Sequence, residues 1–367
     1  MFFKSGGEKV HVAGEPKAKV IPLHSNSGRT QAQRRASAAR ASSSRRHPSL
    51  LTDSGGRASA EQIAAVVREI DQRRGALGGT APAEETPSEL AKRIAAVAEF
   101  ARKRLLGDYT VDEFGFDRHL NNAIFLPLLR VLFNSWFRVE VSGVENLPRT
   151  GAALVVANHA GVLPFDGLMT AVAVHDKHPT NRDLRLLAAD MVFDMPMIGQ
   201  AARKAGHTMA CTADAHRLLA AGELTAVFPE GYKGLGKHFK DRYKLQRFGR
   251  GGFVGAALRT KAPIVPCSIV GSEEIYPMIA DVKLLARLFG LPYFPVTPLF
   301  PLAGPAGLVP LPSKWHIQFG EPIQTSDYDE SAAEDPMITF ELTDQVRETI
   351  QQTLYQLLAN RRNTFLG

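Results

Sequence analysis

Residues 152–167 read AALVVANHAGVLPFDG, and this stretch decides the fold class. Its first seven residues, 152–158, are an apolar run that ends in asparagine, which predicts a buried strand. His159 follows at once and is expected at the carboxyl end of that strand. After Pro164 the chain continues into GLMTAVAVH, residues 167–175, which predicts a helix. A buried strand followed by a helix is the repeating unit of an α/β fold.

Strands and helices also alternate on both sides of this stretch. Apolar segments predict strands at 138–143, 184–189, 224–229 and 263–271. Helical spacing predicts helices at 214–222, 251–261 and 336–361. The alternation indicates an α/β fold with a mostly parallel central sheet flanked by helices. Within that sheet, Val265 and Pro266 are expected beside the strand that leads to Glu230.

The chain has 367 residues, of which 44% are apolar and 22% are charged, as in ordinary globular proteins. Changes in composition and apolar pattern along the chain predict four regions. Residues 1–58 form a disordered basic tail, and 59–113 hold N-terminal helices, at 59–74 and 88–106, joined by a linker. Residues 114–330 form the α/β domain, and 331–367 hold a C-terminal helix that packs on it.

The net charge of +7 belongs to the tail and not to the domain. Residues 1–50 hold ten Lys and Arg against two Glu, which leaves 34 basic and 35 acidic residues in the remainder. The tail is either solvated or an arm for anionic lipid or nucleic acid. A nearly neutral domain argues against a folded nucleic-acid-binding module, and no nucleic-acid partner is expected.

Cysteine content and apolar runs bear on the compartment. Two cysteines form no disulfide framework and favour a reducing compartment. We expect no transmembrane helix, because no uninterrupted apolar run reaches about 18 residues. The first residues turn charged too early for a secretory signal.

Two segments are candidates for contact with lipid. Residues 119–137, HLNNAIFLPLLRVLFNSWF, are apolar and aromatic but are interrupted by Pro127 and Arg130. They predict either an interfacial helix or a helix buried against the domain. Residues 292–312 hold seven of the 23 prolines, a density that excludes a helix. This segment is either a proline-braced loop packed on the domain or an apolar wall for a lipid chain.

His159 and Asp166 are the candidate catalytic pair. In open α/β sheets, ligands bind at the carboxyl ends of the strands, where His159 is expected. A loop of six residues could bring the Asp166 carboxylate back to the imidazole, and a His–Asp pair is a general-base device. The alternative is that Asp166 only caps the next helix and that His159 is an ordinary polar residue.

A second constellation is AVFPEGYKG, residues 226–234, a buried strand that runs into a sharp turn. Glu230 lies at the end of this strand, on the same rim as His159. A carboxylate there can bind a hydroxyl, and the cations that follow, beginning with Lys233, can bind phosphate or form a solvated loop. We find no Gly-x-Ser-x-Gly elbow, no P-loop and no zinc spacing, so no metal or cofactor is expected.

The order Asn-His…Asp, then Phe-Pro-Glu-Gly, then Pro-Ile-Val-Pro resembles the glycerolipid acyltransferases, which include lysophosphatidate and glycerol-3-phosphate acyltransferases. The resemblance covers roughly residues 115–325. It implies acyl transfer from acyl-CoA or acyl-carrier protein to a glycerolipid hydroxyl, as in phospholipid biosynthesis. His159 would be the general base, Asp166 would orient it, and no metal would be required. The substrate-binding residues implied by the resemblance are Asn158, Arg203, Pro229, Glu230, Gly231, Lys233 and Pro266.

The sequence departs from the family pattern at two places. The family usually has four residues between its His and Asp, whereas this chain has six, 160–165, so a wider loop is expected. The family's second block ends in Arg, where this chain has Thr212. Arg203 or a cation of the 233–250 run could substitute. If no cation substitutes, the acceptor lacks a phosphate, as in acylation of diacylglycerol or a glycolipid. A further alternative is a protein that binds lipid without catalysis.

The substrates implied by the resemblance partition into bilayers. We therefore expect peripheral or monotopic attachment to the cytoplasmic face of a membrane. The expected partners are acyl-CoA, a lysophospholipid or other glycerolipid, and the membrane surface.

Overall fold

The computed structural model describes residues 109–249 and 251–365, together with residues 100, 102, 104, 106 and 107. The predicted tail at 1–58 and the predicted helix at 59–74 lie outside these residues, as does most of the predicted helix at 88–106. The described elements all fall within one compact unit, residues 85–367.

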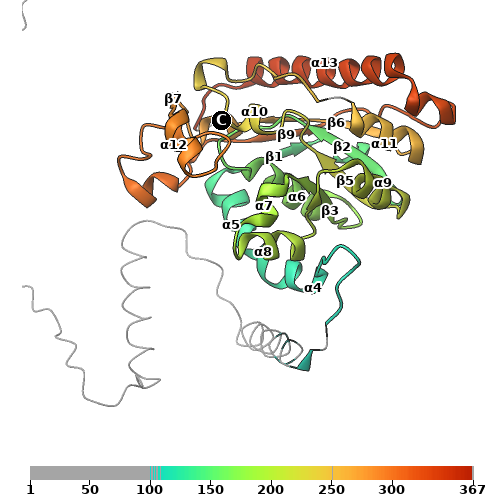
Figure 1. Ribbon diagram of the computed structural model, residues 1–367, viewed down its shortest axis with the longest axis horizontal. Coiled ribbons are helices and arrows are strands. Elements are labelled where there is room, and N and C mark those ends of the chain that lie inside the picture. Colours follow the sequence, from blue (N-terminus) through green and yellow to red (C-terminus); the bar gives the residue numbers. More distant parts are fainter. Residues whose placement is uncertain are drawn as a thin grey trace, which may run out of the picture. The chain divides into compact units, whose positions relative to one another are not determined.

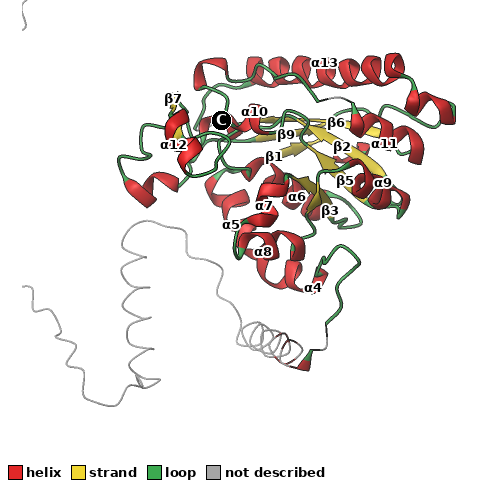
Figure 2. Cartoon of the chain, viewed as in Figure 1, coloured by secondary structure: helices red, strands yellow, loops and turns green. Residues whose placement is uncertain are grey.

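A seven-stranded sheet runs between two layers of helices (Figure 1; strands yellow in Figure 2). Its order is β1-β9-β6-β2-β5-β3-β4, and every neighbouring pair is parallel except β6 and β9. The predicted mostly parallel sheet is confirmed. The strands are β1 Glu140–Ser142, β2 Ala153–Ala157, β3 Leu184–Ala188, β4 Thr208–Met209, β5 Leu224–Val227, β6 Ile264–Val270 and β9 His316–Phe319.

One predicted neighbour relation is wrong. Val265 and Pro266 of β6 pair with Val155 and Val156 of β2, and β5 lies on the opposite edge of β2. Strand β2 therefore separates β6 from the strand that leads to Glu230. The sequence predicts each strand separately, but hydrogen bonding between distant segments determines their order.

The sheet buries both of its faces. In β2, Ala153, Val155 and Ala157 point into one hydrophobic core and Leu154 and Val156 into the other, as the two-residue period of a strand requires. The first core is covered by α5 (Leu126–Val131) and α6 (Phe165–Lys177). The second is covered by α9 (Thr212–Ala220), α11 (Gly252–Thr260) and α13 (Pro336–Asn360).

Shorter helices and a small hairpin complete the described chain. The helices are α4 Arg118–Leu120, α7 Asp190–Asp194, α8 Ile198–Lys204, α10 Tyr232–Leu235 and α12 Lys283–Leu288. Strands β7 (Ala280–Asp281) and β8 (Pro295–Val296) pair outside the main sheet. Helix α12 and this hairpin lie at the left edge of the unit in Figure 1.

The two candidate lipid segments contact each other. Residues 118–136 are helical, with π-helical turns at Asn121–Phe125 and Leu132–Trp136. This helix buries Leu126 and Phe133 but exposes Leu128 and Val131, so it is neither wholly buried nor wholly free. The segment 292–312 is a loop apart from β8 and one 3-10 turn, Gly304–Leu308. The Trp136 indole Nε1 donates to the Pro310 carbonyl at 2.9 Å.

Candidate active site

His159 and Asp166 meet at the carboxyl end of β2. The distance from His159 Nδ1 to Asp166 Oδ2 is 2.7 Å. The Asp166 side chain is fully buried, whereas the imidazole retains 12% exposure. Asp166 does not cap α6, because Pro164 holds the N-cap position, and its oxygens instead accept from the backbone amides of Ala160 and Gly167. His159 Nε2 has no hydrogen-bond partner among the described residues, so it is free to accept a proton.

A tight loop accommodates the six residues between the pair. Gly161 has φ +94°, and a Cβ there would lie 2.4 Å from the Ser272 carbonyl oxygen. Val162 has φ +62°, a strained value for a β-branched residue, and such strain concentrates at functional sites. The loop is held by bonds from the Tyr293 hydroxyl to the Val162 carbonyl and from the Val162 amide to the Leu235 carbonyl. The six intervening residues therefore fit in a tight loop that leaves His159 and Asp166 in contact.

Glu230 holds the backbone of His159. Its side chain is buried at the turn after β5, and Oε1 accepts from the His159 amide at 2.9 Å. The other oxygen, Oε2, accepts from the Gln246 amide at 2.6 Å and lies 3.5 Å from Lys237 Nζ. Both oxygens are engaged within the protein, so the structure gives Glu230 a positioning role and does not support the predicted contact with a substrate hydroxyl.

Two glycines let the Glu230 turn approach His159. Gly231 has φ +53° and ψ −142°, a conformation available essentially to glycine alone. Gly234 lies against the histidine, because a Cβ there would be 2.4 Å from the His159 carbonyl oxygen and 3.0 Å from its Cβ. The Phe-Pro-Glu-Gly motif identifies the first of these glycines, Gly231, as a candidate site residue from sequence alone. The close approach of Gly234 depends on tertiary packing, and the sequence analysis missed it.

A buried ion cluster lies behind Glu230. Lys237 Nζ is 3.5 Å from Glu230 and 3.1 Å from Glu273 Oε1, and all three side chains are almost fully buried. Burial raises the pKa of Glu273 to about 7, although Lys237 and the Tyr243 amide partly oppose that shift. One lysine thus serves two carboxylates that have lost their contact with water.

Two predicted substrate contacts are occupied by the fold. Asn158 is buried, and its amide bridges to Ile269 of β6, donating to the carbonyl at 3.0 Å and accepting from the amide at 2.8 Å. Pro266 is buried in β6, and its carbonyl accepts from Gly320. Asn158 therefore ties the end of β2 to β6, and neither residue presents a free polar group to a substrate.

The other predicted residues lie on the rim or apart from the pair. Pro229 is partly buried between β5 and Glu230, and Lys233 is exposed on α10 with no ion pair in the described part of the chain. The Arg203 guanidinium stacks on the Phe193 ring at 4.6 Å, so it is engaged within the α7–α8 segment. Thr212 is exposed at the start of α9.

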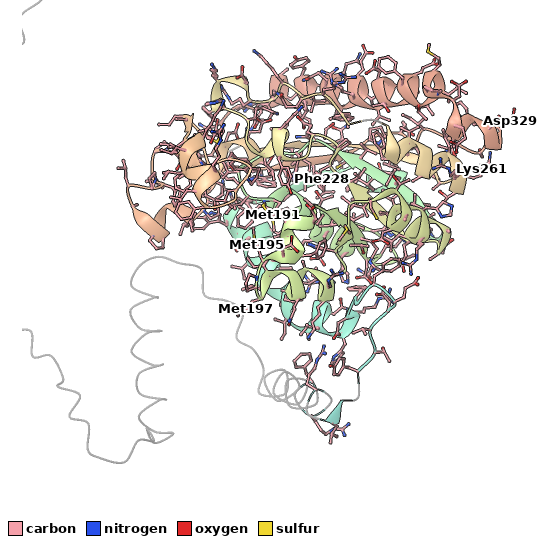
Figure 3. All side chains as sticks on the ribbon, in the orientation of Figure 1. Met191, Met195, Met197, Phe228, Lys261 and Asp329 are labelled. Carbon is pink, nitrogen blue, oxygen red and sulfur yellow. The ribbon has the colours of Figure 1, made fainter. Side chains whose placement is uncertain are left out.

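An aromatic ring lies beside the histidine. The Phe228 ring lies beside the His159 imidazole, with 4.7 Å between their centroids. Figure 3 labels Phe228 together with Met191, Met195 and Met197, and in that view the methionines follow the α7 segment away from Phe228. Met197 is 85% exposed. The contact between Phe228 and His159 depends on folding, and the sequence pattern does not indicate it.

The described residues contain neither a helix suited to span a membrane nor a metal-binding cluster. No described helix combines the length and the apolar character needed to cross a membrane. No group of three or more His, Cys, Asp or Glu among these residues is arranged to hold a metal ion.

Comparison with known proteins gives the class of this chain. The family model described as Acyltransferase matches residues 138–270, which include His159, Asp166 and Glu230. The human DGAT1/2-independent enzyme synthesizing storage lipids is 25% identical over 223 residues, or 59% of this chain and 60% of that enzyme. Residues 138–270 of this chain belong to the Acyltransferase family.

Mycobacterial proteins match this chain over nearly their whole length. An uncharacterized protein of Mycobacterium tuberculosis is 76% identical over 358 residues, or 97% of this chain and 99% of that protein. One of Mycobacterium leprae is 74% identical over 365 residues, or 98% and 99% of the two chains. The crystal structure of the lysophosphatidate acyltransferase PlsC from Thermotoga maritima aligns at TM-score 0.46 and 19% identity, covering 67% of this chain and 83% of that one.

Proposed function

We propose that the chain transfers an acyl group from acyl-CoA or acyl-carrier protein to a hydroxyl of a glycerolipid acceptor such as lysophosphatidate. One observation carries the proposal: His159 and Asp166 are paired at 2.7 Å, at the carboxyl end of a central strand, with Nε2 left free. Family membership supports acyl transfer, and this geometry supports the roles of the two residues.

The proposed reaction needs only one base. His159 Nε2 takes the proton of the acceptor hydroxyl, and the oxygen attacks the thioester carbon of the donor. The carbon–sulfur bond breaks, and the proton passes from His159 to the leaving thiolate. The products are an ester and a free thiol. Asp166 keeps Nδ1 protonated and stabilises the imidazolium, while Glu230 holds the histidine backbone in place.

A second acceptor class has its own support. Thr212 stands where the family usually has an arginine for the acceptor phosphate, and Arg203 is stacked on Phe193. The human relative is named for the synthesis of storage lipids. Diacylglycerol or a glycolipid is therefore the alternative acceptor.

Attachment to a bilayer surface completes the proposal. The apolar edge is defined by exposed Ile279, Leu284, Leu288, Phe289, Leu299, Leu302, Leu308 and Val309. Lys283 and Arg287 lie on α12 among the leucines. Apolar side chains interleaved with cations suit the interface of an anionic membrane.

The test is thiol release from palmitoyl-CoA by the full chain in detergent. The acceptors are lysophosphatidate, glycerol-3-phosphate, other lysophospholipids and diacylglycerol. We expect release that requires one acceptor and falls at least about a hundredfold in His159→Ala. The control is His216→Ala, a histidine on α9, which should retain full activity. Acceptor-dependent release that survives His159→Ala would overturn the assigned base, and no release from any thioester donor would favour a lipid-binding protein.

A further inference from the structure

A basic cavity lies between the loop at 239–244 and the end of α13. We call it the C-terminal pocket. Its volume is about 480 Å³, within the range of small-molecule sites. Its lining is Phe239, Arg242, Tyr243, Lys244, Glu274, Tyr355, Leu358, Arg361, Arg362, Asn363 and Thr364.

The charges of the pocket favour an anion. Glu274 is its single lining carboxylate, and Arg361 neutralises it through Nη1 at 2.6 and 2.8 Å from the two oxygens. The remaining cations are Arg242, Lys244 and Arg362, which are exposed. Lys244 reaches a carboxylate only at 4.0 Å, and neither arginine forms an ion pair within the described residues. Two arginines without an ion pair among the described residues, together with Lys244 at 4.0 Å from Asp241, fit a ligand with several phosphate charges.

Aromatic side chains line the same cavity. Tyr355 is 57% exposed on α13. Phe239 lies on the facing loop, and the Arg242 guanidinium stacks on its ring at 4.5 Å. Exposed aromatic faces and a stacked arginine bind the flat ring of a nucleobase. A phosphate with an attached base therefore matches the lining better than a simple phosphate ion.

The wall of the pocket is connected to the candidate active site. The Tyr243 amide donates to Glu273 at 2.8 Å, and Glu273 pairs with Lys237. Lys237 in turn contacts Glu230, which holds the His159 amide. A donor that occupies both places needs a polyphosphate nucleotide at one end, a thioester at the other and a flexible arm between them. Coenzyme A has these parts.

We propose that the C-terminal pocket binds the phosphorylated adenosine diphosphate part of coenzyme A in the acyl donor. Arg242 and Arg362 contact its phosphates, and the exposed Tyr355 ring stacks on its adenine. This inference rests on the proposed acyl transfer and narrows its donor to an acyl-CoA. The residues of α13 and of the C-terminal segment lie beyond the 138–270 match to the family model.

The test is calorimetric titration of the full chain with coenzyme A and with adenosine 3′,5′-bisphosphate. We expect the double variant Arg242→Ala/Arg362→Ala to bind both at least about tenfold more weakly. The control is Lys240→Ala/Arg247→Ala, which removes two exposed charges from the same loop outside the pocket lining and should bind like the parent. Equal affinity of the pocket variant and the parent would overturn the proposal.

Two further arms separate other sources of phosphate. Pyrophosphate that binds as tightly as coenzyme A, or binding only to vesicles of phosphatidate, would overturn the nucleotide assignment. Turnover of acyl-pantetheine, a donor without the nucleotide, should be unchanged in the pocket variant. Absent turnover with coenzyme A binding retained would reject the acyltransferase proposal but not the pocket, whereas turnover with no coenzyme A binding would reject the pocket alone.

Discussion

At the scale of single residues, the site depends on groups that contact the ring and the backbone of His159. Asp166 holds the ring, Glu230 holds the amide, and Gly234 lies against the carbonyl. Lys237 Nζ lies 3.5 Å from Glu230 Oε2, so it supports the histidine through one intermediate. A base must be held within a fraction of an ångström of its working position, because a 1 Å error can cost about a hundredfold in rate.

Gly234→Ala should displace the catalytic histidine. The added Cβ would lie 2.4 Å from the His159 carbonyl oxygen and 2.8 Å from the Glu230 Cβ, so one of these groups must move. We expect kcat to fall about a hundredfold. The measurement is the rate of thiol release at a saturating concentration of palmitoyl-CoA. Gly249→Ala is the control, because its Cβ would meet nothing within 4 Å. A kcat within twofold of the parent would show that the contact is not needed.

The buried Glu273 should make stability depend on pH. Burial raises its pKa from 4.5 to about 7, so the folded state binds this proton more tightly than the unfolded state. Stability from this group is therefore full below about pH 4.5 and falls as the pH rises toward 7. The loss is up to about 3 kcal/mol, since one pKa unit corresponds to about 1.4 kcal/mol.

The measurement is urea unfolding between pH 4.5 and 8. Glu273→Gln keeps an oxygen for the Tyr243 amide and cannot titrate, so its free energy of unfolding should fall less over that window. Glu321→Gln, an exposed carboxylate, is the control and should follow the parent. Parallel curves for the parent and Glu273→Gln would contradict the prediction.

Residue spacing predicts the catalytic pair but not its supports. Only six residues separate His159 from Asp166, so local sequence brings them together. Gly234, Lys237 and Glu273 reach the site only through folding, and their residue types are common on surfaces. The ligand roles of Asn158 and Glu230 stay predictions, and the structure shows that backbone groups of other segments bond to their polar atoms.

At the scale of elements, α13 closes the second core. Its buried side chains Leu342, Val346, Ile350 and Leu354 follow a helical period and face the sheet. The pattern predicts such a helix from sequence. The strand against which α13 packs, β6, could not be predicted. More than 60 residues separate the two elements, and no local sequence pattern indicates a contact over that distance.

Ile350→Ala should destabilise the protein without reaching the catalytic pair. Ile350 is fully buried, so truncation leaves a cavity that costs about 2–5 kcal/mol of unfolding free energy. Urea unfolding at pH 7 measures the loss. Gln352→Ala, exposed on the same helix, should change that free energy by less than about 0.5 kcal/mol. An Ile350→Ala loss as small as the control's would mean that α13 does not seal this core.

At the scale of the whole molecule, the exposed apolar edge is gathered in one part of the chain. The residues of the apolar edge all lie between 279 and 309, on α12 and on the loop that follows it. The sequence analysis expected lipid contact from 292–312 because of its composition, but it missed α12. That helix exposes leucines while it buries Ala286, a division that only the fold reveals.

Charge substitutions on the apolar edge should release the protein from membranes. Leu288 is 73% exposed and Leu302 is 89% exposed, so aspartate at either position disturbs no core. Each leucine that enters the interface contributes about 1.5–3 kcal/mol, so Leu288→Asp/Leu302→Asp should bind anionic vesicles at least about tenfold more weakly. Vesicle cosedimentation of the full chain measures this.

A matched control tests whether the added negative charge alone weakens binding to vesicles. Met337→Asp/Phe340→Asp places the same two charges on exposed apolar positions of α13, outside the apolar edge. If the edge is the attachment surface, this control binds vesicles within about twofold of the parent, because its two added charges lie outside the edge. Equal losses in the two variants would mean that net charge and not the edge governs binding. Palmitoyl-CoA turnover in detergent should stay unchanged in both, because detergent supplies the substrate without a bilayer and neither pair touches His159.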